Sequence, residues 1–170
     1  NPGEDARLYA AAKQISDFAI SLGINIPTGK DSLSMTQKYP DGKKVFAPGT
    51  VIISAVGEVE NIRQIVEPVL QPVGAEIIFI DFSRDEFHLG GSSFAQVVNA
   101  IGTKVPGVAD PAYFVNAFEV VQSLIRDGLV LAGHDISAGG MITTLLEMTF
   151  GRNDTGMEIN LDGIGENDLI

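Results

Sequence analysis

Two predominantly apolar runs, at residues 51–56 and 77–82, constrain the fold of this chain more than any other feature of its sequence. Both runs are rich in β-branched residues and lack polar alternation, which predicts strands that are buried on both faces. Buried strands need helices or further strands to cover them, so we expect packed layers of secondary structure. Weaker patterns predict four more strands, at residues 24–26, 33–39, 129–132 and 157–161.

Helices are predicted from apolar spacing and from capping residues. Apolar positions across residues 8–22 follow the helical repeat, and Gly23 suits the end of that helix. Asp110 and Pro111 form a strong helix start, as N-cap and first helical residue. Two more helices are predicted, one from Ser92-Ser93 to about residue 101 and one that opens at Gly139-Gly140.

The order of these elements predicts an α+β fold with two parts. From about residue 75, helices and strands alternate, which indicates a layered α/β domain. The first 60 residues supply one helix and several strands, too few for a complete domain. Because Pro68 and Pro72 interrupt the helical spacing nearby, we place the domain junction near residue 60 and predict domains at residues 1–60 and 61–170.

Composition excludes several classes of protein. Of the 170 residues, 45% are hydrophobic and 19% are charged, which indicates a packed core rather than a disordered chain. The net charge of −11, with scattered Lys and Arg, argues against nucleic-acid binding through phosphate contacts. Cysteine is absent, no apolar run approaches the ~20 residues of a membrane span, and no signal peptide is recognisable. We therefore expect a cytoplasmic polypeptide that forms part of a longer protein.

The loop that follows residues 24–26 is the first candidate for chemistry. Gly29, Lys30 and Ser32 lie in it, and the Lys could serve a phosphate. Five residues separate Gly23 from Gly29 where a P-loop needs four, and Asp31 replaces the Ser or Thr that would hold Mg²⁺. The loop is therefore either a functional loop of another kind or a solvated turn.

The stretch from His134 to Gly140 is the most informative candidate. It follows a short apolar run and opens a helix, a place where loops carry function. Asp135 offers the hard oxygen that Mg²⁺ prefers, and Ser137 lies beside the free N–H groups of a helix start, so the two could hold a metal-bound nucleotide phosphate. The alternative is that Asp135 or Ser137 simply caps the helix.

Three other features are ambiguous. Gly90-Gly91-Ser92-Ser93 could form an anion site or an ordinary helix cap, about equally on local grounds. His88 is expected to be solvated, and Glu147 to be a surface or paired carboxylate.

Together these segments resemble the family of large, single-chain phosphoribosylformylglycinamidine synthases, amidotransferases of purine biosynthesis. The matching segments, in order, are residues 1–9, 22–35, 131–140 and 145–148, and the Gly-Lys-Asp-Ser-Leu-Ser-Met string at residues 29–35 is the most specific. The resemblance implies an aminoimidazole ribonucleotide (AIR) synthetase-like fold, with the end of an N-type unit joined to a truncated C-type domain.

The resemblance also implies a reaction. The family converts formylglycinamide ribonucleotide, glutamine and ATP to the amidine, using Mg²⁺ and a glutaminase domain elsewhere in the same chain. ATP phosphorylates the amide oxygen, and ammonia then displaces phosphate. This stretch alone would be an inactive part of such a ligase.

Site residues follow from the same resemblance. Asp135 matches a Mg²⁺ ligand and Ser137 a nucleotide contact, at a site described as an auxiliary ADP site in large-type enzymes. Gly29 and Ser32 match positions that contact ATP and substrate in small-type enzymes, whereas Lys30 stands where those enzymes have an Asn metal ligand. Ala138 replaces a family Asp.

Two other functions remain open. The region could be a purely structural nucleotide-binding module. It could also belong to a related enzyme such as a selenophosphate synthetase or a thiamine monophosphate kinase, against which the string at residues 29–35 argues.

Overall fold

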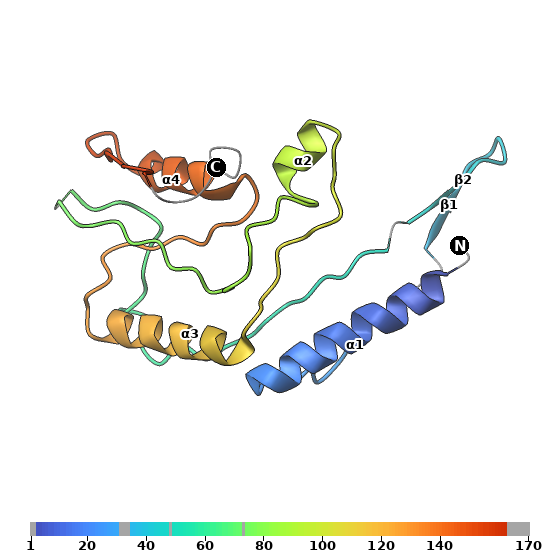
Figure 1. Ribbon diagram of the computed structural model, residues 1–170, viewed down its shortest axis with the longest axis horizontal. Helices are drawn as coiled ribbons and strands as arrows, with labels where there is room; N and C mark the ends of the chain where they lie inside the picture. The colour runs from blue at the N-terminus through green and yellow to red at the C-terminus, as the bar shows by residue number, and fades with distance from the viewer. Residues whose placement is uncertain (1–2, 31–34, 48, 73, 163–170) are drawn as a thin grey trace. The chain divides into compact units, whose positions relative to one another are not determined.

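The computed structural model describes residues 3–30, 35–47, 49–72 and 74–162 (Figure 1). Its contacts divide the chain into two units, Asn1–Glu58 and Val59–Ile170. The fold class is α+β, as predicted, with helices and a small antiparallel sheet. In the described ranges, no helix is long and apolar enough to cross a membrane.

The first unit contains helix α1 (Glu4–Leu22) and a hairpin of β1 (Thr36–Lys38) and β2 (Lys44–Phe46). The predicted end of α1 is confirmed, because Gly23 adopts φ 70°, a left-handed conformation that glycine reaches without strain. The less exposed residues of α1 follow the helical repeat along one face, at Leu8, Ala11, Ile15, Ala19 and Leu22, but none of them is buried.

The hairpin closes over a polar turn at residues 40–42. Thr36 pairs with Phe46 and Lys38 with Lys44. At the turn, the Asp41 carboxylate accepts a hydrogen bond from the Lys43 amide at 3.0 Å, the local bonding that favours Asp in turns. The strand predicted at residues 33–39 is thus confirmed over Thr36–Lys38, while residues 31–34 lie outside the described residues.

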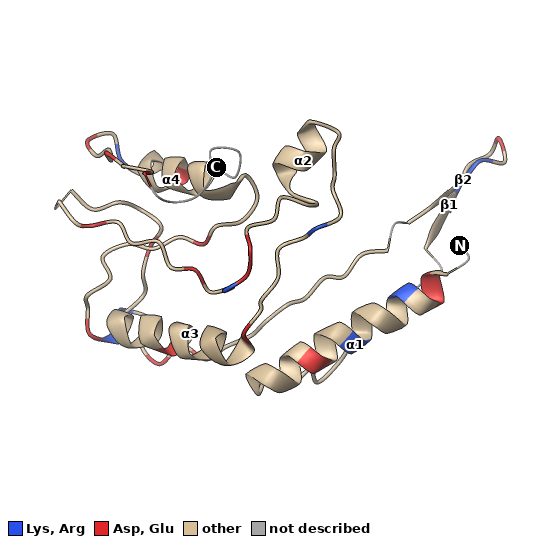
Figure 2. Cartoon of the chain, in the orientation of Figure 1, with Lys and Arg blue, Asp and Glu red and all other residues tan. Residues whose placement is uncertain are grey.

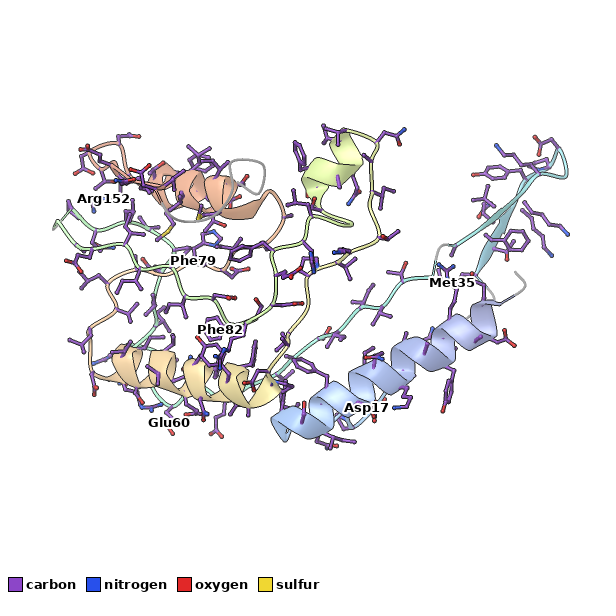
Figure 3. The ribbon with its side chains drawn as sticks, in the orientation of Figure 1. Asp17, Met35, Glu60, Phe79, Phe82 and Arg152 are labelled. Atoms are coloured by element: carbon purple, nitrogen blue, oxygen red, sulfur yellow. The ribbon has the colours of Figure 1, made fainter. Side chains whose placement is uncertain are left out.

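The second unit contains three helices, α2 (Ser93–Val97), α3 (Pro111–Arg126) and α4 (Gly140–Phe150). The predicted start of α3 is confirmed, because the Asp110 carboxylate accepts a 3.0 Å hydrogen bond from the Tyr113 amide. Helix α2 ends at Val97, earlier than predicted. Figure 3 labels Phe82, whose ring packs on that of Phe114 from α3 with centroids 5.6 Å apart.

The strands predicted at residues 24–26, 51–56, 77–82, 129–132 and 157–161 do not form. The only sheet in the described part of the chain is the β1–β2 pair. A strand is stabilised by hydrogen bonds to a neighbouring strand, and these five segments find no such neighbour here. The expectation that the two apolar runs are buried is also wrong, since Ile52 is 86% exposed and Ile78 is 75% exposed.

Little of the described chain is fully buried. Two hydrophobic residues, Ala95 and Met148, have exposed fractions of 4% and 9%, and the polar Thr144 has 6%. The segment around Leu70 approaches α4 at its buried residues. The Leu70 amide donates a 3.0 Å hydrogen bond to the Met148 carbonyl. Thr144 and Met148, one turn apart on α4, form a small core that this hydrogen bond connects to Leu70.

We expect the isolated 170-residue chain to self-associate. Residues 51–56 are extended, apolar and exposed, and unpaired strand edges of this kind tend to pair with another chain. Light scattering as a function of concentration measures the effect, and the variant Ile52→Lys, which puts a charge on the exposed run, should reduce it. A strictly monomeric chain, with uniform hydrogen-exchange protection through the described residues before 60, contradicts this prediction.

Candidate functional site

The loop at residues 132–137 leads directly into α4 and carries the strongest candidates. The helix begins at Gly140, and its N-cap is Gly139, at φ 94°, with no side-chain hydrogen bond to the first turn. Neither Asp135 nor Ser137 therefore caps α4 with its side chain. The capping alternative is wrong for both residues, and their side chains are left available for another role.

Asp135 presents its carboxylate to solvent while its backbone is held. The side chain is 83% exposed, and its Oδ1 lies 3.4 Å from His134 Nδ1. The backbone carbonyl of the same residue accepts a hydrogen bond from the Thr144 hydroxyl at 3.1 Å and lies 2.8 Å from His134 Nδ1. Asp135 thus combines a main chain held by hydrogen bonds with a solvent-exposed hard-oxygen group.

His134 connects the loop to α4. Its side chain is only 18% exposed, and its Nε2 lies 3.3 Å from Glu147 Oε2. Glu147 is therefore a paired carboxylate, in agreement with one of the two readings predicted for it. In the sequence, His134 was given no role beyond marking the start of this loop, and Thr144 was not singled out. The three-residue spacing of Thr144 and Glu147 brings both near one side of α4, but no local pattern shows that they contact residues 134 and 135.

Ser137 is exposed, and its described bond is made by its backbone, whose carbonyl accepts from the Gly140 amide at 3.0 Å. It lies two residues from Asp135 on the same loop, so the structure keeps the two predicted site residues of the second unit together.

Gly29 and Lys30 belong to the first unit and lie in an exposed segment without regular structure. Lys30 makes no ion pair with any residue that the structure describes. Ser32 lies outside the described residues. Figure 2 shows Lys and Arg dispersed along the described chain, as predicted, rather than gathered in a stripe.

The Gly90-Gly91-Ser92-Ser93 segment is an ordinary helix start. Ser92 caps α2 by accepting a 3.1 Å hydrogen bond from the Ala95 amide. Gly90 is required by close packing, because a Cβ at this position would lie 2.0 Å from the Lys104 carbonyl oxygen. A helix of five residues with its own cap is not an anion site, so the capping alternative is confirmed here.

The donor set fits one position of a magnesium shell and no more. Within the described ranges, no three His, Asp or Glu residues come close enough together to hold a metal ion. Mg²⁺ is commonly bound through one or two carboxylates together with waters and substrate phosphates. The Asp135 carboxylate has the right chemistry for one such ligand, and the remaining ligands would have to come from groups other than those described.

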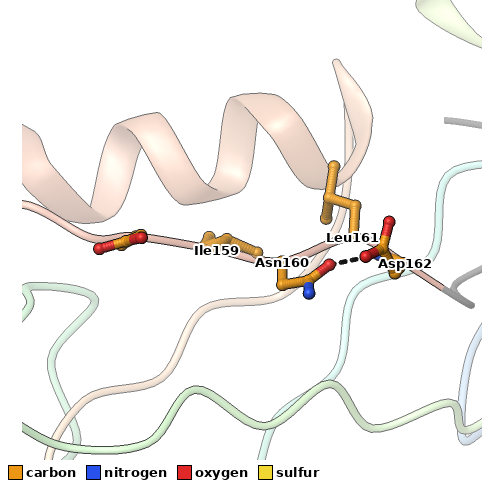
Figure 4. Close-up of a pocket in the computed structure, with 5 residues that line it drawn as sticks. Ile159, Asn160, Leu161 and Asp162 are labelled. Atoms are coloured by element: carbon orange, nitrogen blue, oxygen red, sulfur yellow. Dashed lines mark hydrogen bonds between the residues drawn. The ribbon is translucent and has the colours of Figure 1, made fainter.

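Two hollows in the described surface lie elsewhere. One, in Figure 4, is formed by residues 158–162 alone, where the Asp162 amide donates a 2.7 Å hydrogen bond to Asn160 Oδ1. The other has a volume of about 330 Å³ and is lined mainly by apolar residues of α3 together with Ile80. Neither hollow includes a predicted site residue.

One ion pair in this unit has a clear electrostatic effect. Arg152, labelled in Figure 3, donates two hydrogen bonds to the Asp154 carboxylate at 2.9 and 2.8 Å. These hydrogen bonds lower the pKa of Asp154 and raise the pKa of Arg152. The pair lies shortly after α4, which ends at Phe150, and does not include a residue of the 134–137 loop.

Comparison with known proteins identifies the family to which the chain belongs. Residues 73–169 match the family "AIR synthase related protein, C-terminal domain", and the chain belongs to this family. Residues 1–58 match "FGAR-AT PurM_N-like domain". A curated relative from Arabidopsis thaliana, "Probable phosphoribosylformylglycinamidine synthase, chloroplastic/mitochondrial", is 44% identical over 162 residues. These matches confirm the resemblance to phosphoribosylformylglycinamidine synthases that the sequence motifs indicate.

The match covers 94% of this chain but 11% of the relative, so the chain spans about a tenth of the length of the protein it resembles. No solved structure matches the chain significantly.

Proposed function

We propose that this chain works as part of a phosphoribosylformylglycinamidine synthase, an ATP-dependent ligase of purine biosynthesis. The complete enzyme would convert formylglycinamide ribonucleotide, glutamine and ATP to the amidine, with ammonia delivered by a glutaminase domain of the same protein. The observation that carries the proposal is the match to two domain families in the expected order, within one alignment that covers 94% of the chain.

The domain organisation is part of the proposal. We place the end of an N-type, AIR synthetase-like domain at residues 1–60 and a C-type domain at residues 61–170. The family matches over residues 1–58 and 73–169 support this division, as does the separation of contacts after Glu58.

The nucleotide site would lie at the 134–137 loop. Asp135 would bind Mg²⁺, and Ser137 would donate a hydrogen bond to a phosphate beside the start of α4. The metal would neutralise charge on the phosphates of ATP or ADP. The solvent-facing carboxylate of Asp135 supports this assignment, because a capping residue would have its oxygens engaged by backbone amides.

A second nucleotide or substrate contact would lie at Gly29, Lys30 and Ser32. The ammonium group of Lys30, exposed and without an ion pair among the described residues, is suited to a phosphate. The cytoplasm remains our proposed location, although the name of the relative places that protein in chloroplasts or mitochondria.

The test is an assay of the complete protein that contains this chain. With glutamine as the nitrogen source, it should form the amidine only when ATP and Mg²⁺ are also present, with ADP and glutamate released in step. Product formation from selenide or thiamine monophosphate instead would favour a related enzyme of the superfamily. A folded protein that is inactive with formylglycinamide ribonucleotide contradicts the proposal.

In the same assay, Lys30→Ala should raise the KM for ATP or for the ribonucleotide by about tenfold, since a charge-assisted phosphate contact contributes roughly 1.5–3 kcal/mol. The matched control is Lys43→Ala, which removes an exposed lysine from the hairpin turn of the same unit. If both variants show wild-type kinetics and stability, the loop around Lys30 is a solvated turn.

A further inference from the structure

The backbone carbonyl of Asp135 has two hydrogen-bonding partners, one for each lone pair. The Thr144 hydroxyl donates to it from α4 at 3.1 Å, and the His134 ring nitrogen Nδ1 lies 2.8 Å away. A carbonyl held from two directions fixes the peptide plane and so the direction in which the Asp135 side chain leaves the backbone.

Both partners are anchored to α4. Thr144 is 6% exposed and lies in the small core beside Met148. Glu147, three residues further along the helix, approaches the far side of the His134 ring, with Oε2 3.3 Å from Nε2. The ring is thus held between the Asp135 carbonyl and the Glu147 carboxylate, and the helix provides a rigid base for both contacts.

These contacts leave the Asp135 carboxylate with one long contact and 83% exposed to solvent. Its one described contact, at 3.4 Å, is to the same Nδ1 that lies nearer to the carbonyl, so that N–H cannot serve both oxygens well. Hydrogen bonds that only stabilised the loop would not require short contacts to the Asp135 carbonyl and only a longer one to its carboxylate. The closer contacts of Thr144 and His134 are made to the Asp135 carbonyl, and the carboxylate remains exposed to solvent.

We infer that Thr144, His134 and Glu147 are positioning residues that hold the Asp135 carboxylate ready for a metal-bound nucleotide. The inference rests on the proposed role of Asp135 and adds three residues that act through it. Partners that orient a metal ligand commonly change metal affinity by about 10–100-fold when they are removed.

The experiment measures Mn²⁺ as a spectroscopic substitute for Mg²⁺, by electron paramagnetic resonance in the presence of ADP, on the complete protein. Thr144→Val removes the hydroxyl at nearly constant volume, and Thr144→Ser restores it. Thr143→Val is the matched control, because the Thr143 hydroxyl donates to the carbonyl of Gly139, the N-cap of α4, and not to Asp135. Glu147→Gln, on the exposed side of the helix, is a second variant that should fold even if Thr144→Val does not.

We expect Thr144→Val and Glu147→Gln to weaken ADP-dependent Mn²⁺ binding by about tenfold or more, with wild-type affinity in Thr144→Ser and Thr143→Val. The melting temperature of the metal-free protein separates positioning from folding: a role in stability alone would lower it without changing the affinity of the folded protein. If wild type binds Mn²⁺ with ADP, Asp135→Asn abolishes binding and the Thr144 and Glu147 variants bind normally, the inference is overturned while the proposed site stands. If wild type binds no Mn²⁺ with ADP, the proposed site fails and this inference fails with it.

Discussion

Asp135→Asn in the complete protein is expected to release bound ADP and Mg²⁺ and to lower the melting temperature. The substitution keeps the shape of the side chain and removes the negative charge that a divalent cation requires. Because the nucleotide would bind only the native state, its loss should remove about 2.7 kcal/mol of stabilisation at a free ligand concentration 100-fold above the Kd. Mass spectrometry and metal analysis of the purified protein measure the bound ligands, and calorimetry measures the shift.

The matched control is Asp127→Asn, which neutralises another exposed aspartate of the same unit, at the end of α3. It should retain stoichiometric ADP and Mg²⁺. If Asp135→Asn also retains both, Asp135 is not a metal ligand. If it loses both ligands while turnover continues unchanged, the site is auxiliary, and its nucleotide supports the fold rather than the reaction.

Local features of the helices could be predicted from the sequence because their causes are local. Helix α3 begins where it does because Asp110 caps its first turn and the ring of Pro111 fixes φ at a helical value. Helix α1 ends at Gly23 because glycine adopts the left-handed conformation without strain. The turn at residues 40–42 likewise follows from its own side chains. Such signals do not depend on what lies elsewhere in the molecule.

The strands could not be predicted in the same way because their cause is not local. The runs at residues 51–56 and 77–82 have the composition of buried strands, yet neither forms a strand and most of their residues are exposed. Apolar composition shows that a segment favours burial, whereas a ladder of hydrogen bonds also needs a partner strand. For these two runs, the sequence predicted both the burial and the strand pairing incorrectly.

The candidate site shows the same limit. Asp135 and Ser137 could be singled out because an acidic residue and a hydroxyl before a glycine-rich helix start are recognisable in the sequence. The contact of Thr144 with the Asp135 carbonyl spans nine positions and depends on how the loop folds back on α4. The bridge from His134 to Glu147 spans thirteen, so neither contact could be read from local patterns.

The isolated 170-residue chain is expected to form no amidine with either nitrogen source, glutamine or free ammonium. Glutamine should fail because the chain contains no cysteine to act as a glutaminase nucleophile. Ammonium bypasses that step and should fail for a different reason: the described residues offer one free carboxylate at the 134–137 loop and no group of three metal ligands. A site with so few ligands would hold a metal-bound nucleotide weakly.

The measurement is ADP and amidine formation by the purified chain, with the complete protein as the positive control under the same conditions. Amidine formed from ammonium alone would show that this chain holds the whole synthetase site, and would overturn the view that it is one part of a larger catalytic assembly.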